Sequence, residues 1–491
     1  MSTTCGPPGA EETLDPADWD AFRRFAHGAL DDTLDYLATV RERAAWQPVP
    51  ADIRERLHAP APVEPEGIEA AYRDFLECVR PFPTGNIHPR FWGWVQGNGT
   101  PLGMIAELLA AGMNPNAAAF EHAAAYVELQ VLGWFKAIMG FPDSAGGLLV
   151  SGGSMANLVG LAAARNNVPG VDARARGLHA LERRLVLYAS SETHSSVRKA
   201  VELLGLGTDA LRLLQVRDDF RVDPAAVEAA IAADLHRGLH PFCVVANAGT
   251  VNTGAIDPLD ALADVCRRQS LWLHVDGAFG ALAALSPALK PRLAGMDRAD
   301  SLAFDCHKWM CQPYDVACAL VRSAAQHRAA FSVVPDYLEK LPAGLACAPI
   351  DFSEYGVQLS RSFRALKLWL SIKAEGLGKF GRLIEQNVAQ AAHLTARIEA
   401  DSSLELLAPA PLNIVNFRYA PPGIAAERLD DLNCRILIEL QERGIAVPSS
   451  TRIAGRFSLR VANVNHRSRR EDFDLLADET VRLGDRLAAT G

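Results

Sequence analysis

Two short segments place reactive side chains directly after apolar runs. Lys308 follows such a run in SLAFDCHKWM, and Asp276 ends one in LWLHVDGAFG. A lysine there can form a Schiff base with a carbonyl compound, and a carboxylate can hold a cationic ring nitrogen. Most lysines are instead solvated surface charges, and an aspartate in this position can simply cap the following loop.

Two further segments repeat this arrangement, with His194 in SSETHSSVRKA and Thr250 in ANAGT. A histidine there can stack on a ligand ring or transfer a proton, although a capping or core histidine is more common. Parallel strands bind ligands at their carboxyl ends. His194, Thr250, Asp276 and Lys308 in succession therefore predict one ligand site at the sheet edge.

The segment SGGSMAN, residues 151–157, follows the apolar run 148–150 and precedes an Ala/Leu-rich helical stretch. Its glycines let the backbone approach a ligand, and the free N–H groups of a helix start attract phosphate, with the Ser154 hydroxyl nearby. A Ser/Gly turn that only caps a helix has the same appearance. The segment is thus a candidate phosphate site.

Three competing motifs fail on their context. GLGKFG, residues 376–381, follows a helical stretch rather than a strand, which disfavours a dinucleotide site. Cys306, His307, Cys311 and Cys318 lack the CxxC spacing of a zinc site, so we expect no metal. The sequence has no GxxxxGK[ST] loop, and nucleotide hydrolysis has no support.

Short apolar runs alternate with Ala-rich helical stretches between residues 100 and 380, which predicts an α/β domain with a mostly parallel sheet. The predicted strands are 185–189, 211–216, 242–246, 271–275, 301–304 and 317–321. After Gly381, a helical stretch and the strand-like runs 414–418, 445–448 and 457–461 predict a small α+β domain.

The first hundred residues differ in character. Apolar residues at helical spacing predict a one-faced helix over 17–46, and the proline-rich segment 47–66 is expected to be a connector. We therefore predict three parts: an N-terminal helical segment (1–99), a large ligand-binding domain (100–380) and a small C-terminal domain (381–491).

The composition is typical of a globular protein with a small-molecule ligand. The 491 residues include 58 acidic and 49 basic side chains, a net charge of −9, without Lys/Arg blocks, which argues against nucleic acid. Nine cysteines without framework spacing indicate reduced thiols and a cytoplasmic location. We expect no signal peptide and no membrane segment, because the apolar stretches are interrupted well short of ~18 residues.

Taken together, the motifs HPRFWGW, SGGSMANL, THSSV, NAGTVNTGAIDPL, HVDGAFG, HKW, SRSFRALKLWL and FSLRVA, between His88 and Ala462, resemble the group II pyridoxal-phosphate-dependent amino-acid decarboxylases. The resemblance implies the fold called type I: an N-terminal helical segment that packs across a dimer, a seven-stranded α/β domain and a small C-terminal domain. It also implies pyridoxal phosphate as the cofactor and a homodimer with its active site near the subunit interface.

The resemblance also implies roles for single residues. Lys308 is expected to form the Schiff base with the cofactor, and Asp276 to pair with its ring nitrogen, which keeps the ring able to accept electrons. In this assignment His194 stacks on the ring, Ala278 covers its other face and Thr250 lies beside it. Gly153, Ser154 and His307 are expected to hold the phosphate. Asp305 and Cys306 stand where animal members have Asn and Pro, a departure that puts this phosphate shell in doubt.

Substrate and product are the least determined features. Arg460 matches the arginine that the resemblance assigns to the substrate carboxylate, with a structural salt bridge as the alternative. Trp92, Trp94 and Phe120 are candidates for an apolar side-chain pocket, which favours an aromatic substrate, whereas Arg90 leaves an acidic one open.

Tyr337, in VVPDYLEKL, matches a catalytic-loop position where the family's decarboxylases have Tyr and its aldehyde synthases usually have Phe. A phenol there can return a proton to Cα, which favours an amine over an aldehyde. The expected reaction is decarboxylation of an L-amino acid to its amine and CO2. The alternatives are an oxygen-dependent aldehyde synthase or a glutamate/aspartate-type decarboxylase.

Overall fold

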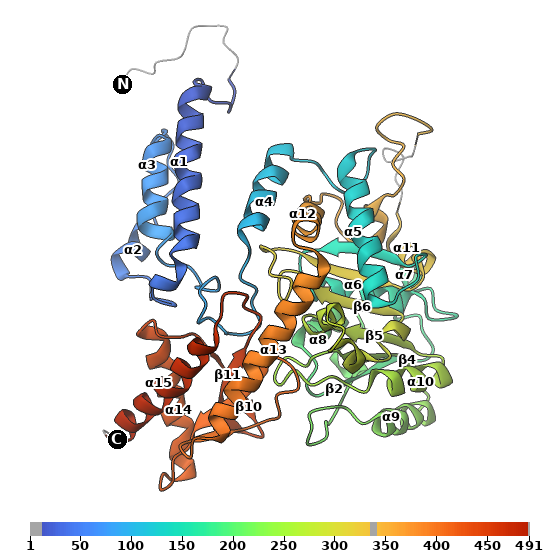
Figure 1. Ribbon diagram of the computed structural model, residues 1–491. Coiled ribbons are helices and arrows are strands. Elements are labelled where there is room, and N and C mark those ends of the chain that lie inside the picture. The colour runs from blue at the N-terminus through green and yellow to red at the C-terminus, as the bar shows by residue number, and fades with distance from the viewer. Residues whose placement is uncertain (1–11, 334–340, 490–491) are drawn as a thin grey trace. The chain divides into compact units, whose positions relative to one another are not determined.

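The computed structural model describes residues 12–333 and 341–489 (Figure 1). The chain divides into two compact units, Met1–Arg43 and Ala44–Gly491. The first contains α1 (Trp19–Ala38), which begins where the Asp18 carboxylate accepts hydrogen bonds from two N–H groups. This helix is shorter than the predicted 17–46, because Thr39 closes its last turn and a 3₁₀ turn, Val40–Glu42, follows.

The proline-rich segment 47–66 is not simply a connector, as the sequence predicted. It contains the short helix α2 (Ala51–Arg56), which begins directly after Pro50. Proline is compatible with the entrance to a helix, where no N–H is needed, so proline content alone was misleading here. The helix α3 (Ile68–Asp74) follows.

A seven-stranded sheet forms the centre of the second unit, in the order β1-β7-β6-β5-β4-β2-β3. All pairings are parallel except those of β7, which is antiparallel to β1 and to β6. The strands read as continuous apolar runs because the sheet is buried on both faces. They are β1 (Gly146–Val150), β2 (Leu185–Ser190), β3 (Leu211–Leu214), β4 (His240–Asn247), β5 (Trp272–Asp276), β6 (Ser301–Asp305) and β7 (Ala317–Val321).

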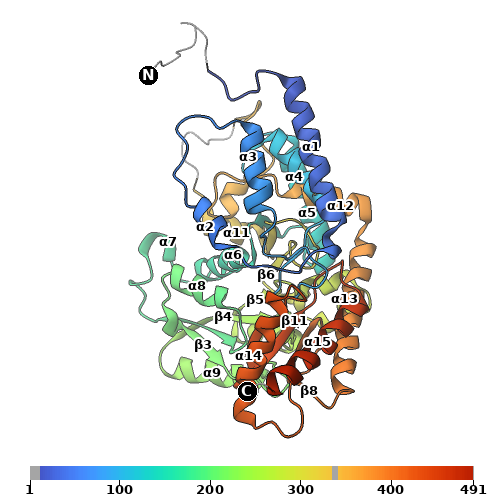
Figure 2. The same ribbon diagram turned by 90° about the vertical axis from the view of Figure 1, so that its left-hand side faces the viewer.

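Helices connect the strands and pack against the sheet (Figures 1 and 2). Among them, α6 contacts β5, β6 and β7, which places its first turn close to the carboxyl ends of β5 and β6. The helices of this part are α4 (Pro101–Met113), α5 (Ala123–Met139), α6 (Gly153–Asn166), α7 (Ala173–Arg176), α8 (Ser195–Leu203), α9 (Pro224–His236), α10 (Leu259–Gln269), α11 (Ala324–Phe331) and α12 (Ala365–Glu375).

A second, antiparallel sheet has the order β10-β11-β9-β8 and packs with α13, α14 and α15, drawn in orange to red in Figure 2. The α/β class with a small α+β part is as predicted, whereas the predicted strand 445–448 is wrong. The strand begins after Pro448, which has no N–H to donate to a ladder. The elements are β8 (Leu404–Leu406), β9 (Ile414–Tyr419), β10 (Ser449–Ile453), β11 (Arg456–Ala462), α13 (Leu377–Glu399), α14 (Ala426–Glu442) and α15 (Arg470–Ala489).

The segment around Trp92 is far from the C-terminal sheet in sequence but hydrogen-bonded to its surroundings. The backbone N–H of Trp92 donates to the Val447 carbonyl at 2.9 Å, and the N–H of Ala462 donates to the Trp92 carbonyl at 3.0 Å. This segment therefore crosses the predicted boundary between the first and third parts. The division at residues 99 and 380 stays a prediction.

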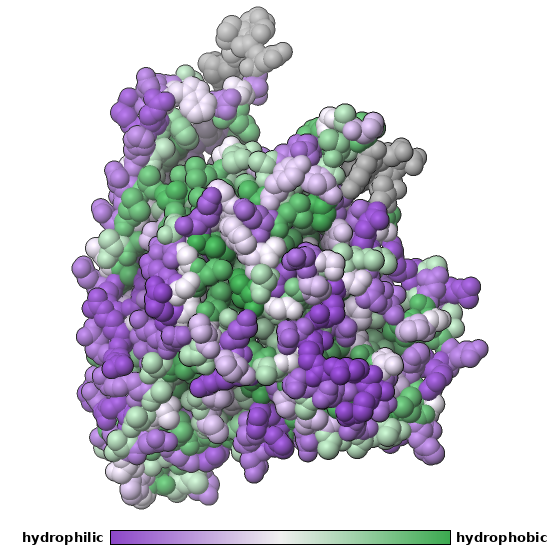
Figure 3. Space-filling model, turned by 45° about the vertical axis from the view of Figure 1, so that its right-hand side comes forward, coloured by the Kyte–Doolittle hydropathy of each residue, from purple (hydrophilic) through white to green (hydrophobic). Residues whose placement is uncertain are grey.

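The face drawn in Figure 3 mixes hydrophilic and hydrophobic residues. Among the described residues, no helix is both long and apolar enough to cross a membrane.

Candidate active site

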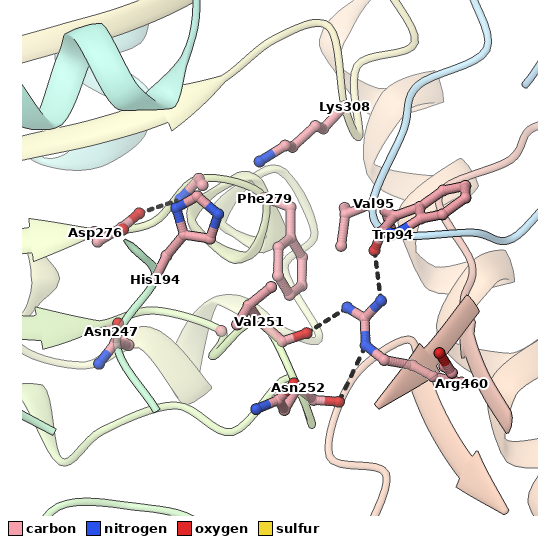
Figure 4. Close-up of a pocket in the computed structure, with 13 residues that line it drawn as sticks. Trp94, Val95, His194, Asn247, Val251, Asn252, Asp276, Phe279, Lys308 and Arg460 are labelled. Atoms are coloured by element: carbon pink, nitrogen blue, oxygen red, sulfur yellow. Dashed lines mark hydrogen bonds between the residues drawn. The ribbon is translucent and has the colours of Figure 1, made fainter. Parts of the chain in front are cut away.

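A cavity of about 270 Å³ lies at the carboxyl ends of β4, β5 and β6 (Figure 4). Six residues that the sequence analysis singled out line it. They are Trp94, His194, Asp276, Ala278, Lys308 and Arg460, which come from loops or strands up to 366 positions apart. The remaining lining residues are Val95, Asn247, Gly249, Val251, Asn252, Phe279 and Ser450.

Asp276 is the last residue of β5, and its carboxylate is buried at the floor of the cavity. Its Oδ2 accepts a hydrogen bond from Asn157 Nδ2 at 2.9 Å, and its Oδ1 accepts one from the Ala278 backbone N–H at 3.1 Å. Burial raises the pKa of Asp276, while the Asn157 hydrogen bond and the Lys308 charge oppose that shift. A cation placed beside this carboxylate would relieve the penalty of burial.

His194 caps α8 and directs its ring toward the cavity (Figure 4). Its Nδ1 accepts a hydrogen bond from the Ser196 backbone N–H at 3.2 Å and lies 2.8 Å from Ser196 Oγ. Burial is the main cause that lowers its pKa. With Nδ1 occupied as an acceptor, the neutral ring carries its proton on Nε2.

Lys308 lies three residues beyond the end of β6, and its Nζ is 2.8 Å from Oδ2 of Asp305. Asp305 is almost completely buried, and its Oδ1 has no hydrogen-bond partner among the described residues. A buried oxygen without a donor is costly, so this position is incomplete unless another group or a proton joins it.

Gly153, Ser154 and His307, the predicted phosphate residues, are not in the cavity wall, although two of them lie next to Asp305. A Cβ on Gly153 would come within 2.8 Å of Asp305 Oδ2, and His307 Nε2 is 3.7 Å from Asp305 Oδ1. Gly153 starts α6 without a side-chain cap. The start of α6 and His307 thus form one polar corner around Asp305, which suits an anion only if the carboxylate is neutralised.

Arg460, on β11, reaches the cavity from the second sheet. Its guanidinium donates to the carbonyl of Trp94 at 2.7 Å, to that of Asn252 at 3.3 Å and to that of Val251, and to Ser449 Oγ at 3.2 Å. All these acceptors are neutral, so the structural salt bridge considered from the sequence is absent from the described residues. Burial lowers the pKa of Arg460 to about 10. A buried cation without a counter-charge favours an anionic ligand.

Three further predicted site residues, Thr250, Trp92 and Phe120, are not part of the cavity lining. The Thr250 hydroxyl pairs with Thr253 Oγ1 at 3.0 Å and accepts from the Ala255 N–H at 3.1 Å, so it closes a turn. Trp92 is buried, donates from Nε1 to Ser468 Oγ at 3.0 Å and stacks on Phe473 with 4.7 Å between ring centroids. Phe120 is outside the lining set. Tyr337 lies outside the described residues.

The sequence analysis assigned no role to several residues that the structure brings to the site, although it named Asp305 as a departure from the family. Asn157 contacts Asp276, Asp305 contacts Lys308, and Phe279 lines the cavity. Each belongs to a motif already quoted, SGGSMAN, FDCHKW or HVDGAFG. The motifs therefore marked the right segments, but only the packing of α6 against β5 and β6 identifies which of their side chains point inward.

Residues 50–420 of the chain match the family model described as the pyridoxal-dependent decarboxylase conserved domain. The chain belongs to this family. A decarboxylase family member from Bacillus atrophaeus, named aromatic-L-amino-acid decarboxylase, is 35% identical and the alignment covers 92% of this chain and 93% of that protein. The group II assignment made from the motifs is thereby confirmed.

Two solved structures of the family are similar over nearly the whole chain. One is of Oryza sativa TDC with PLP and tryptamine, with a TM-score of 0.88, 27% identity and coverage of 97% of this chain and 100% of that one. The other is of Rhodiola rosea 4-hydroxyphenylacetaldehyde synthase, with a TM-score of 0.85, 25% identity and coverage of 96% and 99%. The fold is that of the pyridoxal-phosphate decarboxylases.

This decarboxylase uses pyridoxal phosphate, and its cavity fits that group. Lys308 would provide an amine for the aldehyde, and the buried Asp276 would provide a carboxylate for a cationic ring nitrogen. The unpartnered Asp305 Oδ1 marks the corner where Gly153 leaves no space for a larger side chain. Chemically, the amine and the buried carboxylate match the aldehyde and the ring of the cofactor, and the start of α6 matches its phosphate once Asp305 is neutralised. The chain is an amino-acid decarboxylase of this family.

Proposed function

We propose that this enzyme converts an aromatic L-amino acid to the corresponding amine and CO2. The observation that carries the proposal is the cavity wall, where Trp94, Val95, Val251 and Phe279 lie beside the reactive group Lys308. Aromatic and aliphatic walls stabilise a flat apolar side chain. The relative from Bacillus atrophaeus, 35% identical, is named for aromatic substrates, which supports the same choice.

The cavity residues have complementary roles in this proposal. When bound, pyridoxal phosphate supplies a sink for the electrons released as the substrate carboxylate leaves. Lys308 attaches the cofactor, Asp276 holds a proton at its ring nitrogen, and His194 and Ala278 cover the two faces of its ring. Gly153, Ser154 and His307 bind the phosphate at the start of α6.

Arg460 binds the substrate carboxylate in this proposal. Its guanidinium is buried, and its hydrogen-bond acceptors within residues 12–333 and 341–489 are neutral oxygens, so an arriving carboxylate supplies the missing negative charge. Trp94 has an exposed fraction of 54% and forms the solvent side of the wall, whereas Phe279 is buried. The substrate side chain would lie between them.

Formation of an amine rather than an aldehyde rests on Tyr337, which is outside the described residues. A phenol close to Cα delivers the proton that completes amine formation. We propose that Tyr337 has this role, on the strength of its place in VVPDYLEKL.

Assembly and location are also proposals. A homodimer is favoured by the apolar stripe of α1, with Trp19, Phe22 and Phe25, and by the exposed Leu108 and Met113 of α4. The cytoplasm is favoured because all eight cysteines within the described residues are free thiols. Sedimentation of the purified protein as a monomer would contradict the dimer.

The test is to saturate the protein with pyridoxal phosphate and offer L-tryptophan, L-tyrosine, L-phenylalanine, L-glutamate and L-aspartate. Carbon dioxide, amine, aldehyde and hydrogen peroxide are measured together. Carbon dioxide with an equal amount of amine from aromatic substrates supports the proposal. Aldehyde with peroxide would assign an oxidative reaction, and turnover of the acidic substrates alone would overturn the substrate class.

A matched pair of variants connects the substrate class to the cavity. Trp94→Leu removes an aromatic wall, and the KM for an aromatic substrate is expected to rise about tenfold, the value of one good apolar contact. Trp369→Leu, on α12 and outside the cavity lining, is the control and should leave KM unchanged. Equal effects of the two variants would show that the change reflects general destabilisation.

A further inference from the structure

Asn157, for which the sequence suggested no role, is hydrogen-bonded to both sides of the cofactor cavity. Its Nδ2 donates to Asp276 Oδ2 at 2.9 Å and to Ser196 Oγ at 3.0 Å, and Ser196 Oγ in turn lies 2.8 Å from Nδ1 of His194. Asn157 is itself 1% exposed. One buried amide thus connects the carboxylate at the cavity floor to the histidine in the cavity wall.

A second set of contacts holds the other end of the Asn157 amide. Its Oδ1 lies 2.9 Å from Nε2 of His274, and Nδ1 of His274 lies 2.8 Å from Oγ of Ser301. The indole N–H of Trp272 donates to the same Ser301 Oγ at 2.8 Å. These residues form one continuous buried chain that ends at Asp276.

The donor and acceptor properties of these groups allow only one order of donation along this series of hydrogen bonds. A carboxylate only accepts hydrogen bonds, so Asn157 must turn its NH2 group toward Asp276 and its oxygen toward His274. His274 must then carry its proton on Nε2, and its Nδ1 must accept from the Ser301 hydroxyl. The indole N–H of Trp272, which can only donate, donates to Ser301 Oγ, the last acceptor in the series.

His274 is well suited to fix this direction because it stays neutral. It is completely buried, and burial lowers its pKa to about 3. A Cβ on Gly160 would lie 2.5 Å from Cε1 of His274, so only glycine at this position of α6 leaves room for the ring. The imidazole is therefore held between α6 and β5 with one proton.

We propose that Asn157 and His274 are positioning residues that hold the Asp276 carboxylate in its orientation and ionised state. Neither touches the cofactor in this arrangement; each acts through Asp276, and Asn157 also acts through Ser196 on His194. The inference rests on the proposed role of Asp276 at the cofactor ring nitrogen. If the amide were lost, Asp276 would keep only the Ala278 N–H as a neutral donor among the described residues.

The test compares His274→Leu, His274→Gln and Asn157→Leu with the parent enzyme. Asn157→Leu removes a hydrogen bond to a buried charged group, so kcat is expected to fall about 10- to 100-fold while KM changes little. His274→Leu leaves the Asn157 oxygen without its donor and should lower kcat about tenfold. The glutamine variant retains an N–H donor and should recover most of that loss.

Two readouts do not depend on turnover. The visible absorbance of bound pyridoxal phosphate should shift to shorter wavelength in Asn157→Leu, because the ring nitrogen loses its fixed counter-charge. In protein labelled with ¹⁵N-histidine, His274 should show a protonated Nε2 and an unprotonated Nδ1, with the resonance assigned by its loss in His274→Gln. The opposite tautomer would reverse the chain of hydrogen bonds and overturn the proposal.

Asn433→Ala is the matched control. Asn433 is another fully buried asparagine, which bonds to the backbone of Tyr419 and Leu429 in the C-terminal part. It should lower stability without changing the absorbance of the bound cofactor. If the Asn157 and Asn433 variants behave alike, Asn157 is only structural and the proposal fails. If aromatic substrates are not decarboxylated but the absorbance responds as expected, only the substrate assignment fails.

Discussion

Asp276 and Asp305 are the same residue type at the same place on neighbouring parallel strands, yet their surroundings differ. Each is the last residue of its strand and is buried. Asp276 is held by neutral donors, an amide and a backbone N–H. Asp305 is held by the Lys308 ammonium, and its Oδ1 has no hydrogen-bond partner in the part of the chain that the structure describes. The first environment is complete within the protein, and the second needs another group.

This difference indicates which parts of the site are rigid before ligands arrive. A carboxylate fixed by a buried hydrogen-bond chain keeps its position when Lys308 changes its bonding. A carboxylate paired with Lys308 loses that partner once the lysine reacts. We therefore expect the Asp276 carboxylate to keep its position when the cofactor binds, and the Asp305 carboxylate to change its hydrogen-bond partners.

The largest expected effect comes from Lys308→Ala, which removes both the reactive amine and the partner of Asp305. The variant should lose decarboxylation completely, because Lys308 is the only lysine among the described residues that line the cavity. Absorbance above ~400 nm from the bound cofactor should disappear as well. Lys290→Ala, at an exposed lysine, is the control. Residual turnover by Lys308→Ala would refute the assignment of the lysine.

The next largest effect should come from Asp276→Asn, which keeps the shape of the side chain but removes its charge. We expect kcat to fall about 10²- to 10³-fold, the loss typical of one preorganised electrostatic group. Steady-state kinetics with the cofactor at saturation measure it. A matching change at Asp305→Asn would erase the distinction between the two carboxylates.

Acid should lower the stability of the folded protein, because His274, which is hydrogen-bonded to Asn157 next to Asp276, is buried and neutral. Burial lowers the pKa of His274 to about 3 and that of His327 to about 4. The unfolded chain gains these protons near pH 6.5, so the stability is present above that value and falls as the pH drops toward 4. The expected slope is about 1.4 kcal/mol per pH unit for each histidine.

Urea unfolding at several pH values between 7 and 5 measures this slope. His274→Leu removes the contribution of His274 to this slope. Carboxylates also titrate in acid, but they contribute equally to parent and variant, so the difference between the two slopes reports His274 alone. A slope that is unchanged in His274→Leu would mean that the ring is protonated in the folded state and that the direction of the hydrogen-bond chain is wrong.

The smallest expected effect comes from Asp305→Asn. Removal of one negative charge from the corner formed by Gly153 and His307 should strengthen the binding of inorganic phosphate by the protein without cofactor by about 1 kcal/mol, or about fivefold. Calorimetric titration with phosphate measures it. Asp300→Asn, next to the opposite end of β6, is the control. Weaker phosphate binding in Asp305→Asn would show that Asp305 supports the anion.

Much of the fold could be predicted because it depends on local patterns. The strand 317–321 was predicted with its observed bounds, and the other predicted strands of the large sheet differ by one or two residues at their ends. Two of the errors arose where proline was involved. Pro50 directly precedes α2 within the supposed connector, and β10 begins only after Pro448. The effect of a proline depends on whether the structure needs an N–H group at that position.

The sequence by itself predicted Lys308, Asp276 and His194 as site residues, because these follow apolar runs in motifs that identify the family. It also determined the α/β class and the cofactor. Tertiary structure decided that Trp94 rather than Trp92 lines the cavity, since the chain turns at residues 93–95, where Trp94 has a positive φ, and Trp92 is buried against Phe473.

Tertiary structure also decided the partners of the two carboxylates. Asn157 reaches Asp276 across 119 positions of sequence, because α6 packs over β5. Motifs record which side chains a reaction needs, whereas hydrogen-bond partners depend on how helices and strands pack. That packing is set by the whole core and cannot be read from a single segment.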